Sequence, residues 1–334
     1  MLGRRMLARG AAAIAMGGTA LGHSGGTALA QGSNPAAYPT HPLRLVVGYP
    51  PGGASDLFAR LLAAHMGTRL GQNVVVENKP GGGAVLASET VVRAPADGHT
   101  LLHVDNGILT YNPALYSRLP YDPDRDLAGF GFIGRFPLFL MVRPDHAANS
   151  FADLVARSRN GTLAVASPGV ASPHHLALEM AKRRAGLQAT HVPYRGTPAA
   201  VQDLLAGNVE CAVVDCATGT PYITSGRVKT LCCFSEARSP TAQQVPTLRE
   251  LGFANAVAYG WQGMSVAAAT PAPILARLNQ ALLAAVAADD VQARFRDLGI
   301  ENRASTPAEF AAFVRQENAE WRPLIRELGI KLDG

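Results

Sequence analysis

The 334-residue chain is poor in several features, and each scarcity excludes a class of protein. Charged residues make up 16% of it against 48% hydrophobic residues, which is too apolar for an intrinsically disordered chain. Aromatic residues are only 6%, whereas Ala and Gly are plentiful, and this favours a closely packed α/β protein. No uninterrupted apolar run approaches the roughly 18 residues of a membrane-spanning helix. The length suggests two domains.

The motifs of common enzyme classes are also missing. The sequence contains no G-x-G-x-x-G, no Walker loop and no H-E-x-x-H. One G-x-S-x-G string, at residues 22–26, lies in the N-terminal leader without a strand–turn–helix context. An α/β enzyme that acts on a carboxylate therefore stays only as an alternative to a binding protein.

Cysteine is scarce, and its spacing does not predict a metal site. None of the four cysteines has C-x-x-C spacing, and no His-rich segment lies near them. In an exported protein a disulfide can form, and the favoured bridge pairs Cys216 with Cys232 or Cys233. The alternative is that the thiols act as small hydrophobic groups in apolar strands.

The N-terminus has the pattern of an export signal. A twin-arginine-like segment, Arg4 to Arg9, precedes a weak apolar stretch and an A-x-A site, which predicts cleavage between Ala30 and Gln31 and a periplasmic location. Export by the general or the twin-arginine route and retention as an anchor remain alternatives. Removing residues 1–30 lowers the net charge from +5 to +2. The one basic cluster, at residues 182–184, ends a predicted helix, so we expect no nucleic-acid partner.

The rest of the chain is organised around residues 43–70. An apolar strand at 43–49 is broken by Pro50 to Gly53, and Ser55 is expected to cap a helix that ends before Gly71. A strand, a Gly-rich turn and a helix N-terminus form a seat for an anion, because free N–H groups and the helix dipole favour negative charge there. We predict that this seat holds a small carboxylate.

The same alternation continues along the chain and predicts parallel sheets in two lobes. We expect strands at 74–77, 100–105, 162–167, 189–192, 209–215 and 229–234, and helices at 85–93, 151–159, 174–184, 198–205, 221–225, 274–288 and 291–298. Residues 114–127 are expected to be a loop, and Thr306 opens a capping box before a final helix. Apolar runs at 132–142 and 262–268 are candidate crossings. The expected lobes are residues 31–135 with 262–334, and residues 136–261.

Polar, Gly-rich loops follow the predicted strands at 50–56, 80–83, 106–107, 167–173, 194–197 and 215. Ligands of open α/β sheets bind at the carboxyl ends of the strands, so these loops predict a cleft between the lobes. Each loop alone is also an ordinary turn. Ser172 could instead cap a helix, and Asp215 could instead form a structural hydrogen bond. His174 and His175 are adjacent in a predicted helix, so they point to different faces, which argues against a shared metal ion.

Seven strings in order carry a resemblance to a known family: YPTHPLR at 38–44, PGGASD at 51–56, VENKPG at 76–81, ADGHTLL at 96–102, NPALY at 112–116, HVPYRG at 191–196 and VPTL at 245–248. The chain resembles the Bug family, the periplasmic receptors of tripartite tricarboxylate transporters. The resemblance implies a two-lobed Venus-flytrap fold of type II, with a mainly parallel sheet in each lobe. Ala54 and Ala84 stand where the family often has Gly or a hydroxyl, so the identity of the ligand is not predicted.

The resemblance also implies a function. It implies a monomeric receptor without catalysis, cofactor or metal, which binds a small di- or tricarboxylate, acidic amino acid or aromatic acid and delivers it to membrane permease subunits. A sensor that presents its closed form to a membrane signalling protein is the alternative. In the family the first two Gly-rich loops grip a carboxylate, and the second lobe closes over it. The full set of ligand-binding residues predicted here is Tyr49, Gly53, Ala54, Ser55, Asp56, Gly82, Gly83, Asn106, Ser167, Ala171, Ser172, His175, Tyr194, Gly196, Thr197 and Asp215.

Overall fold

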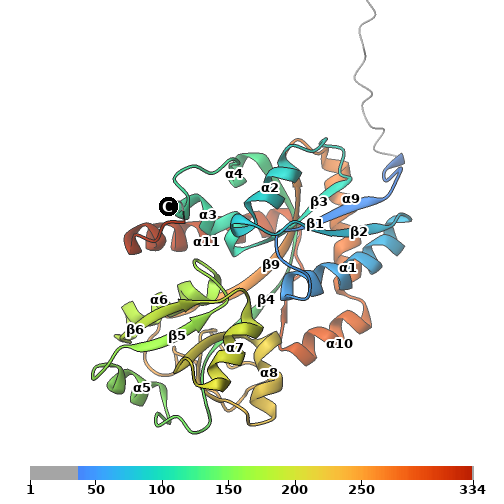
Figure 1. Ribbon diagram of the computed structural model, residues 1–334. Helices are drawn as coiled ribbons and strands as arrows, with labels where there is room; N and C mark the ends of the chain where they lie inside the picture. The colour runs from blue at the N-terminus through green and yellow to red at the C-terminus, as the bar shows by residue number, and fades with distance from the viewer. Residues whose placement is uncertain (1–36, 333–334) are drawn as a thin grey trace, which may run out of the picture. The chain divides into compact units, whose positions relative to one another are not determined.

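The structure is a computed structural model that describes residues 37–332. The predicted signal peptide and its cleavage point lie outside the described residues. Figure 1 shows strands and helices alternating along most of the chain. Within residues 37–332, no helix combines the length and apolar character needed to cross a bilayer.

The observed elements follow the predicted alternation. The strands are β1 (Leu43–Val47), β2 (Val74–Asn78), β3 (Thr100–Asp105), β4 (Leu127–Val142), β5 (Leu163–Ser167), β6 (Ala189–Pro193), β7 (Cys211–Asp215), β8 (Lys229–Cys233), β9 (Tyr259–Ala267) and β10 (Glu301–Asn302). The helices are α1 (Ala54–Leu70), α2 (Val85–Val92), α3 (Asn112–Leu115), α4 (Pro123–Asp126), α5 (Phe151–Ser158), α6 (Pro173–Ala185), α7 (Thr197–Ala206), α8 (Cys216–Thr224), α9 (Ala272–Val286), α10 (Asp289–Leu298) and α11 (Pro307–Leu328).

Strand pairing forms two groups that share β4. The first group has the order β2-β1-β3-β9-β4, in which β1 is parallel to β2 and β3, and β9 is antiparallel to β3 and β4. The second group repeats this order as β6-β5-β7-β4-β8, with β5 parallel to its neighbours and β4 antiparallel to β7 and β8. Each group is therefore a mixed sheet whose antiparallel pairings come from the crossing strands.

The crossing strand β4 changes partners at Pro137. Its residues from Leu127 to Pro137 pair with β9, and those from Leu138 onward pair with β7. A proline has no N–H to donate, so it interrupts the ladder at the point where one group gives way to the other. The predicted crossing at 132–142 is thus the second part of a strand of 16 residues.

Arg135 fastens this junction. Its guanidinium donates to Glu301 of β10 (Nε···Oε2 2.7 Å) and to Glu236, which follows β8 (Nη2···Oε2 3.2 Å). The same group lies 3.9 Å from the centre of the Tyr259 ring at the start of β9. The Tyr259 hydroxyl in turn accepts the Glu236 N–H at 2.7 Å. One side chain therefore joins both groups of strands.

Glycines in the crossing strands allow close packing of α11. A Cβ atom at Gly263 would lie 2.4 Å from the ring of Phe310, and one at Gly129 would lie 2.7 Å from the same ring. Phe310 is 1% exposed and belongs to an aromatic cluster with Phe132 and Trp261. Only glycine fits at these positions, which explains their place in otherwise apolar strands.

Three predictions about local structure were wrong. Residues 114–127 were expected to be a loop, but they contain α4 and the end of α3. The helix expected at 221–225 begins at Cys216, because Asp215 caps it. Ser55 does not cap α1: Gly53 is the N-cap residue, and Ser55 lies inside the first turn. The capping box at Thr306 is confirmed.

The four cysteines, Cys211, Cys216, Cys232 and Cys233, are buried free thiols. Burial raises the pKa of Cys211 to about 12 and that of Cys233 to about 11. The thiols are therefore protonated at neutral pH and pack as small hydrophobic groups. The favoured Cys216 bridge is absent from the structure.

The glycine packing yields a stability prediction. Gly263→Ala should lower the free energy of unfolding by about 1–3 kcal/mol, because the new methyl group collides with the Phe310 ring. Gly161→Ala is the matched control, since a Cβ there meets nothing within 4 Å, and it should change stability by less than about 0.5 kcal/mol. Urea denaturation measures both. Equal stability of the two variants would contradict this account of the packing.

A second prediction concerns Glu317 of α11, which accepts the Trp261 indole N–H at 2.8 Å. Burial raises the pKa of Glu317 from 4.5 to about 7, so the folded chain holds more protons than the unfolded chain between these values. This contribution to stability is complete below pH 4.5 and is lost as the pH rises through 7. As the pH rises from 4.5 to 7, the free energy of unfolding of Glu317→Gln should increase by about 3 kcal/mol relative to that of the wild type. Denaturation experiments at several pH values measure this difference. A difference between the two proteins that does not change with pH would refute it.

Candidate functional site

The first candidate loop joins β1 to α1 and is held by Asp56. The Asp56 carboxylate accepts the Gly52 N–H, the Arg60 Nε–H and the Asn78 amide, each at 3.0 Å. Burial opposes its charge, but these donors outweigh burial and keep the pKa of Asp56 below its ordinary value. Asp56 was predicted to bind ligand, and the structure shows its carboxylate shaping the loop.

The start of α1 leaves hydrogen-bond donors available. Gly53 provides no side-chain cap, so the first-turn N–H groups of α1 are not covered by a capping side chain. The Ser55 Oγ accepts the Gln262 amide at 3.2 Å, and the Gln262 Oε1 bonds the His103 Nε2 at 3.0 Å. Burial lowers the pKa of His103 to about 4, so this histidine is neutral at physiological pH. The Ser55 Oγ is thus the final acceptor of a chain of bonds that links α1, β9 and β3.

The second candidate loop contains three successive left-handed residues, Gly82, Gly83 and Ala84, with φ values of 52°, 61° and 68°. The Asn112 amide donates to the Gly83 carbonyl at 2.9 Å and supports this conformation. Ala84 pays about 1–2 kcal/mol for a conformation that suits glycine. Strain of this kind is concentrated at functional loops.

Two further predicted residues have structural bonds. Asp105 accepts the Ile108 N–H at 3.1 Å and the hydroxyl of Tyr49, and burial raises the pKa of Asp105. The Asn106 side chain bonds the Tyr111 hydroxyl, the Tyr259 carbonyl and the Trp261 N–H, the last at 2.8 Å. Tyr49 and Asn106 therefore bind β1, β3 and β9 together at the carboxyl end of β3.

In the second group, the loop after β5 is built on a pair of stacked histidines. The Ser167 Oγ bonds the His191 Nε2 at 2.6 Å, and the His191 ring stacks on His175 with 3.8 Å between centroids. The His175 Nδ1 accepts the Ala171 N–H at 2.9 Å, and Ser172 caps α6. Burial and the neighbouring His175 lower the pKa of His191 to about 4.

The remaining predicted residues centre on Asp215, which caps α8. Its carboxylate accepts the Thr218 N–H at 2.8 Å and the Thr197 hydroxyl at 2.9 Å. The Tyr194 hydroxyl donates to Asp203 at 2.6 Å, and Gly196 is the uncapped N-cap residue of α7. The analysis of the sequence missed the contact of His174 with Asp215, because it depends on the direction of a side chain.

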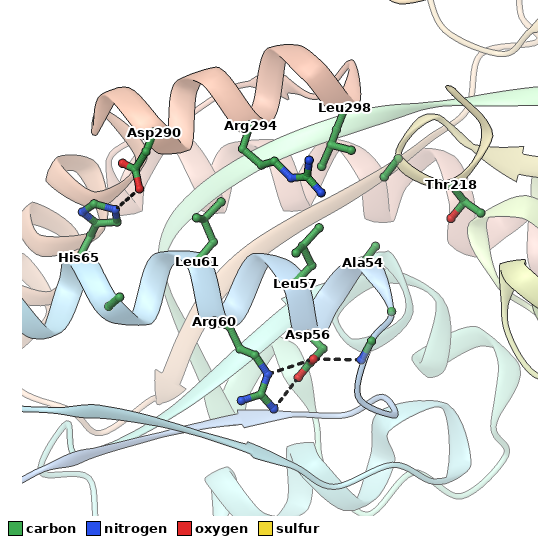
Figure 2. A pocket seen from close by; sticks show the side chains of 14 residues that line it. Ala54, Asp56, Leu57, Arg60, Leu61, His65, Thr218, Asp290, Arg294 and Leu298 are labelled. Carbon is green, nitrogen blue, oxygen red and sulfur yellow. Dashed lines mark hydrogen bonds and ion pairs between the residues drawn. The ribbon is translucent and has the colours of Figure 1, made fainter. Parts of the chain in front are cut away.

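A pocket of about 640 Å³ is lined by the turn before α1 and by residues of α1, α8 and α10. Figure 2 shows it between α1 and α10, with Leu57 and Leu61 on one wall, Arg294 and Leu298 on the other, and Thr218 of α8 across the opening. Of the predicted residues, only Gly53, Ala54 and Asp56 line it. The pocket therefore flanks the candidate site, and it reaches both the α1 turn and the start of α8.

One described group has residue types that bind metals. Ligand atoms of His41, Asp97 and His99 lie within 4.8 Å of one another. The His99 Nε2 accepts the Thr40 N–H at 3.2 Å, which leaves the proton of a neutral ring on Nδ1, the nitrogen that faces Asp97. The two imidazole rings are also stacked at 3.8 Å, so their lone pairs do not converge on one point. This geometry does not suit a metal ion.

Comparison with known proteins identifies the family. The model of the tripartite tricarboxylate transporter family receptor matches residues 58–330. The chain belongs to this receptor family. A UPF0065 protein from a Pseudomonas species is 35% identical over 87% of this chain and 87% of its own length. BugT of Bordetella pertussis is 33% identical over 88% of this chain and 91% of its own length.

Solved structures agree with this receptor assignment. The periplasmic binding protein BugD is 31% identical, covers 88% of this receptor and 99% of its own chain, and has a TM-score of 0.80. An R. palustris protein solved with adipate gives 29% identity over 88% of this receptor and 99% of its chain, with a TM-score of 0.81. MatC from Rhodopseudomonas palustris, solved with bound malate, is 30% identical over 86% of this receptor and 100% of its own chain, with a TM-score of 0.79. The predicted two-lobed α/β periplasmic-binding-protein fold is confirmed.

The structural role of Asn106 can be tested. Asn106→Ala removes its bonds to Tyr111, Tyr259 and Trp261 and leaves a buried Trp261 N–H without its partner. We expect the free energy of unfolding to fall by about 2–4 kcal/mol. Asn208→Ala, which removes an exposed bond to Asp203, should cost less than about 1 kcal/mol. Similar unfolding midpoints for the two variants in urea would contradict the role assigned to Asn106.

Proposed function

We propose that this receptor captures a small carboxylate between its two lobes and delivers it to membrane permease subunits. The observation that carries the proposal is the start of α1, where uncapped N–H groups and the Ser55 hydroxyl lie beside a loop that Asp56 fixes. Such a helix N-terminus favours an anion. On the opposite side, the loops at Ser167 to Ser172 and Thr197, together with Asp215, close over the ligand.

The solved relatives support this ligand class. One contains adipate and another malate, both small dicarboxylates, and both share the fold over most of the chain. We infer that the ligand of this receptor is a carboxylated metabolite of similar size. It is bound and released unchanged, without a cofactor, because the candidate site uses hydrogen bonds rather than an activated nucleophile.

Hydrogen bonds of this kind are strong enough for the task. Each bond to a charged group contributes roughly 1.5–3 kcal/mol, so four or five give about 6–15 kcal/mol before ordering costs. Micromolar affinity requires about 8 kcal/mol. The backbone donors of α1 and the Gly82–Ala84 turn, helped by hydroxyl groups, are therefore sufficient without a buried countercharge.

The proposed mechanism requires motion of the two lobes. We take the two lobes as residues 31–135 with 262–334 and residues 136–261, and they rotate about the segments that cross between them. Ligand contacts from both lobes stabilise the closed form. The receptor works as an exported periplasmic monomer. Deletion of its gene distinguishes transport from sensing: loss of uptake indicates transport, whereas altered gene induction with uptake intact indicates sensing.

Ligand binding is tested by thermal unfolding with a panel of di- and tricarboxylates, acidic amino acids and aromatic acids. A ligand at 100 times its dissociation constant should stabilise the wild type by about 2.7 kcal/mol. Ser55→Ala should weaken binding of that ligand about 10- to 100-fold, because one charge-directed hydrogen bond is lost. Ser225→Ala is the control: Ser225 lies at the C-terminal end of α8, away from Asp215 at its start, and this variant should bind the ligand normally. No stabilisation by any member of the panel would overturn the proposal.

A further inference from the structure

His174 is the buried side chain in the candidate site that the proposed ligand contacts do not use. It is the second residue of α6 and is 6% exposed. The ring Nδ1 has no partner among the described residues, whereas Nε2 faces the Asp215 carboxylate. Buried polar groups are rarely left unpaired because they lose their bonds to water. The Nδ1 atom is therefore available to a partner that is not part of this chain.

The nearest charge to this ring is Asp215. The His174 Nε2 lies 3.4 Å from the Asp215 Oδ2, a distance that suits an ion pair when the ring is protonated. Burial disfavours the charge of Asp215, but His174, Thr218 and Thr197 outweigh burial and keep the pKa of Asp215 below its ordinary value. A fixed negative charge thus lies beside the His174 ring.

Other titratable groups around α6 are committed elsewhere. The helix packs against β7, β9 and β6. On α6 itself, His175 stacks on His191 of β6, and Glu179 pairs with Lys182 at 2.7 Å. On β9, Tyr259 lies under Arg135, and on β7 Cys211 is a protonated thiol. Asp215 is consequently the one acid paired with His174 among the described residues.

We propose that the His174 ring binds a second anionic group of the ligand through Nδ1. This inference rests on the proposed function, which places the first carboxylate at the α1 turn. An imidazolium ring has a donor on each nitrogen, so Nε2 serves Asp215 while Nδ1 serves the ligand. The positive charge also separates the ligand from the Asp215 carboxylate, which would otherwise repel it. Opening of the lobes gives the ligand access to the ring.

The test compares dicarboxylates with monocarboxylates of the same chain length by titration calorimetry. The probes are succinate with butyrate, adipate with hexanoate, and suberate with octanoate. In His174→Phe, the affinity for the dicarboxylate that the wild type prefers should fall at least about tenfold, while its monocarboxylate partner changes less than about threefold. His174→Gln keeps an amide donor in the site and serves if the Phe variant does not fold.

The outcomes separate the two proposals. An unchanged preference for dicarboxylates in both His174 variants would overturn the role of His174 and leave carboxylate binding intact. A wild-type protein that binds none of the six acids, nor any acid of the wider panel, would overturn both.

Discussion

The continuity of β4 is the constraint on which the rest of the structure depends. One strand supplies a member to each of the two sheets, and Pro137 marks the point at which its partners change. Arg135 then ties β10, the start of β9 and the segment after β8 to this same point. Because both groups are registered on one backbone, the carboxyl ends of their parallel strands are brought to a common region.

Polar groups of the candidate site are of two kinds, those already bonded within the protein and those proposed to bind a ligand. Acids and amides such as Asp56 and Asn106 use their hydrogen bonds to hold loops and strands together. The groups left available are backbone N–H groups at uncapped helix starts, the Ser55 hydroxyl and the His174 ring. A receptor that must release its ligand benefits from this division, because its rigid loops are already formed and few side chains need ordering on binding.

The prediction from sequence was most successful where local patterns decide the outcome. Apolar strands, Gly C-caps such as Gly71 and the Thr306 capping box were all predicted, because each depends on a few adjacent residues. The errors arose where distant contacts decide. Ser55 has the residue type of a cap, but it lies inside the helix, where its Oγ accepts the amide of Gln262, two hundred residues away, and the N-cap position falls on Gly53. The start of α8 was misplaced because Pro221 was taken as a beginning, although Asp215 already caps the helix.

The sequence by itself determined the α/β class, the order of strand–loop–helix units and the loops that carry the candidate site, because these follow from periodicity and from Gly and Pro at turns. The tertiary structure alone decided which polar side chains in those loops are already bonded within the protein. Side-chain direction depends on partners distant in sequence, as the His103–Gln262–Ser55 chain and the His174–Asp215 pair show. For this reason the predicted loops include residues that hold the protein together as well as those proposed to hold the ligand.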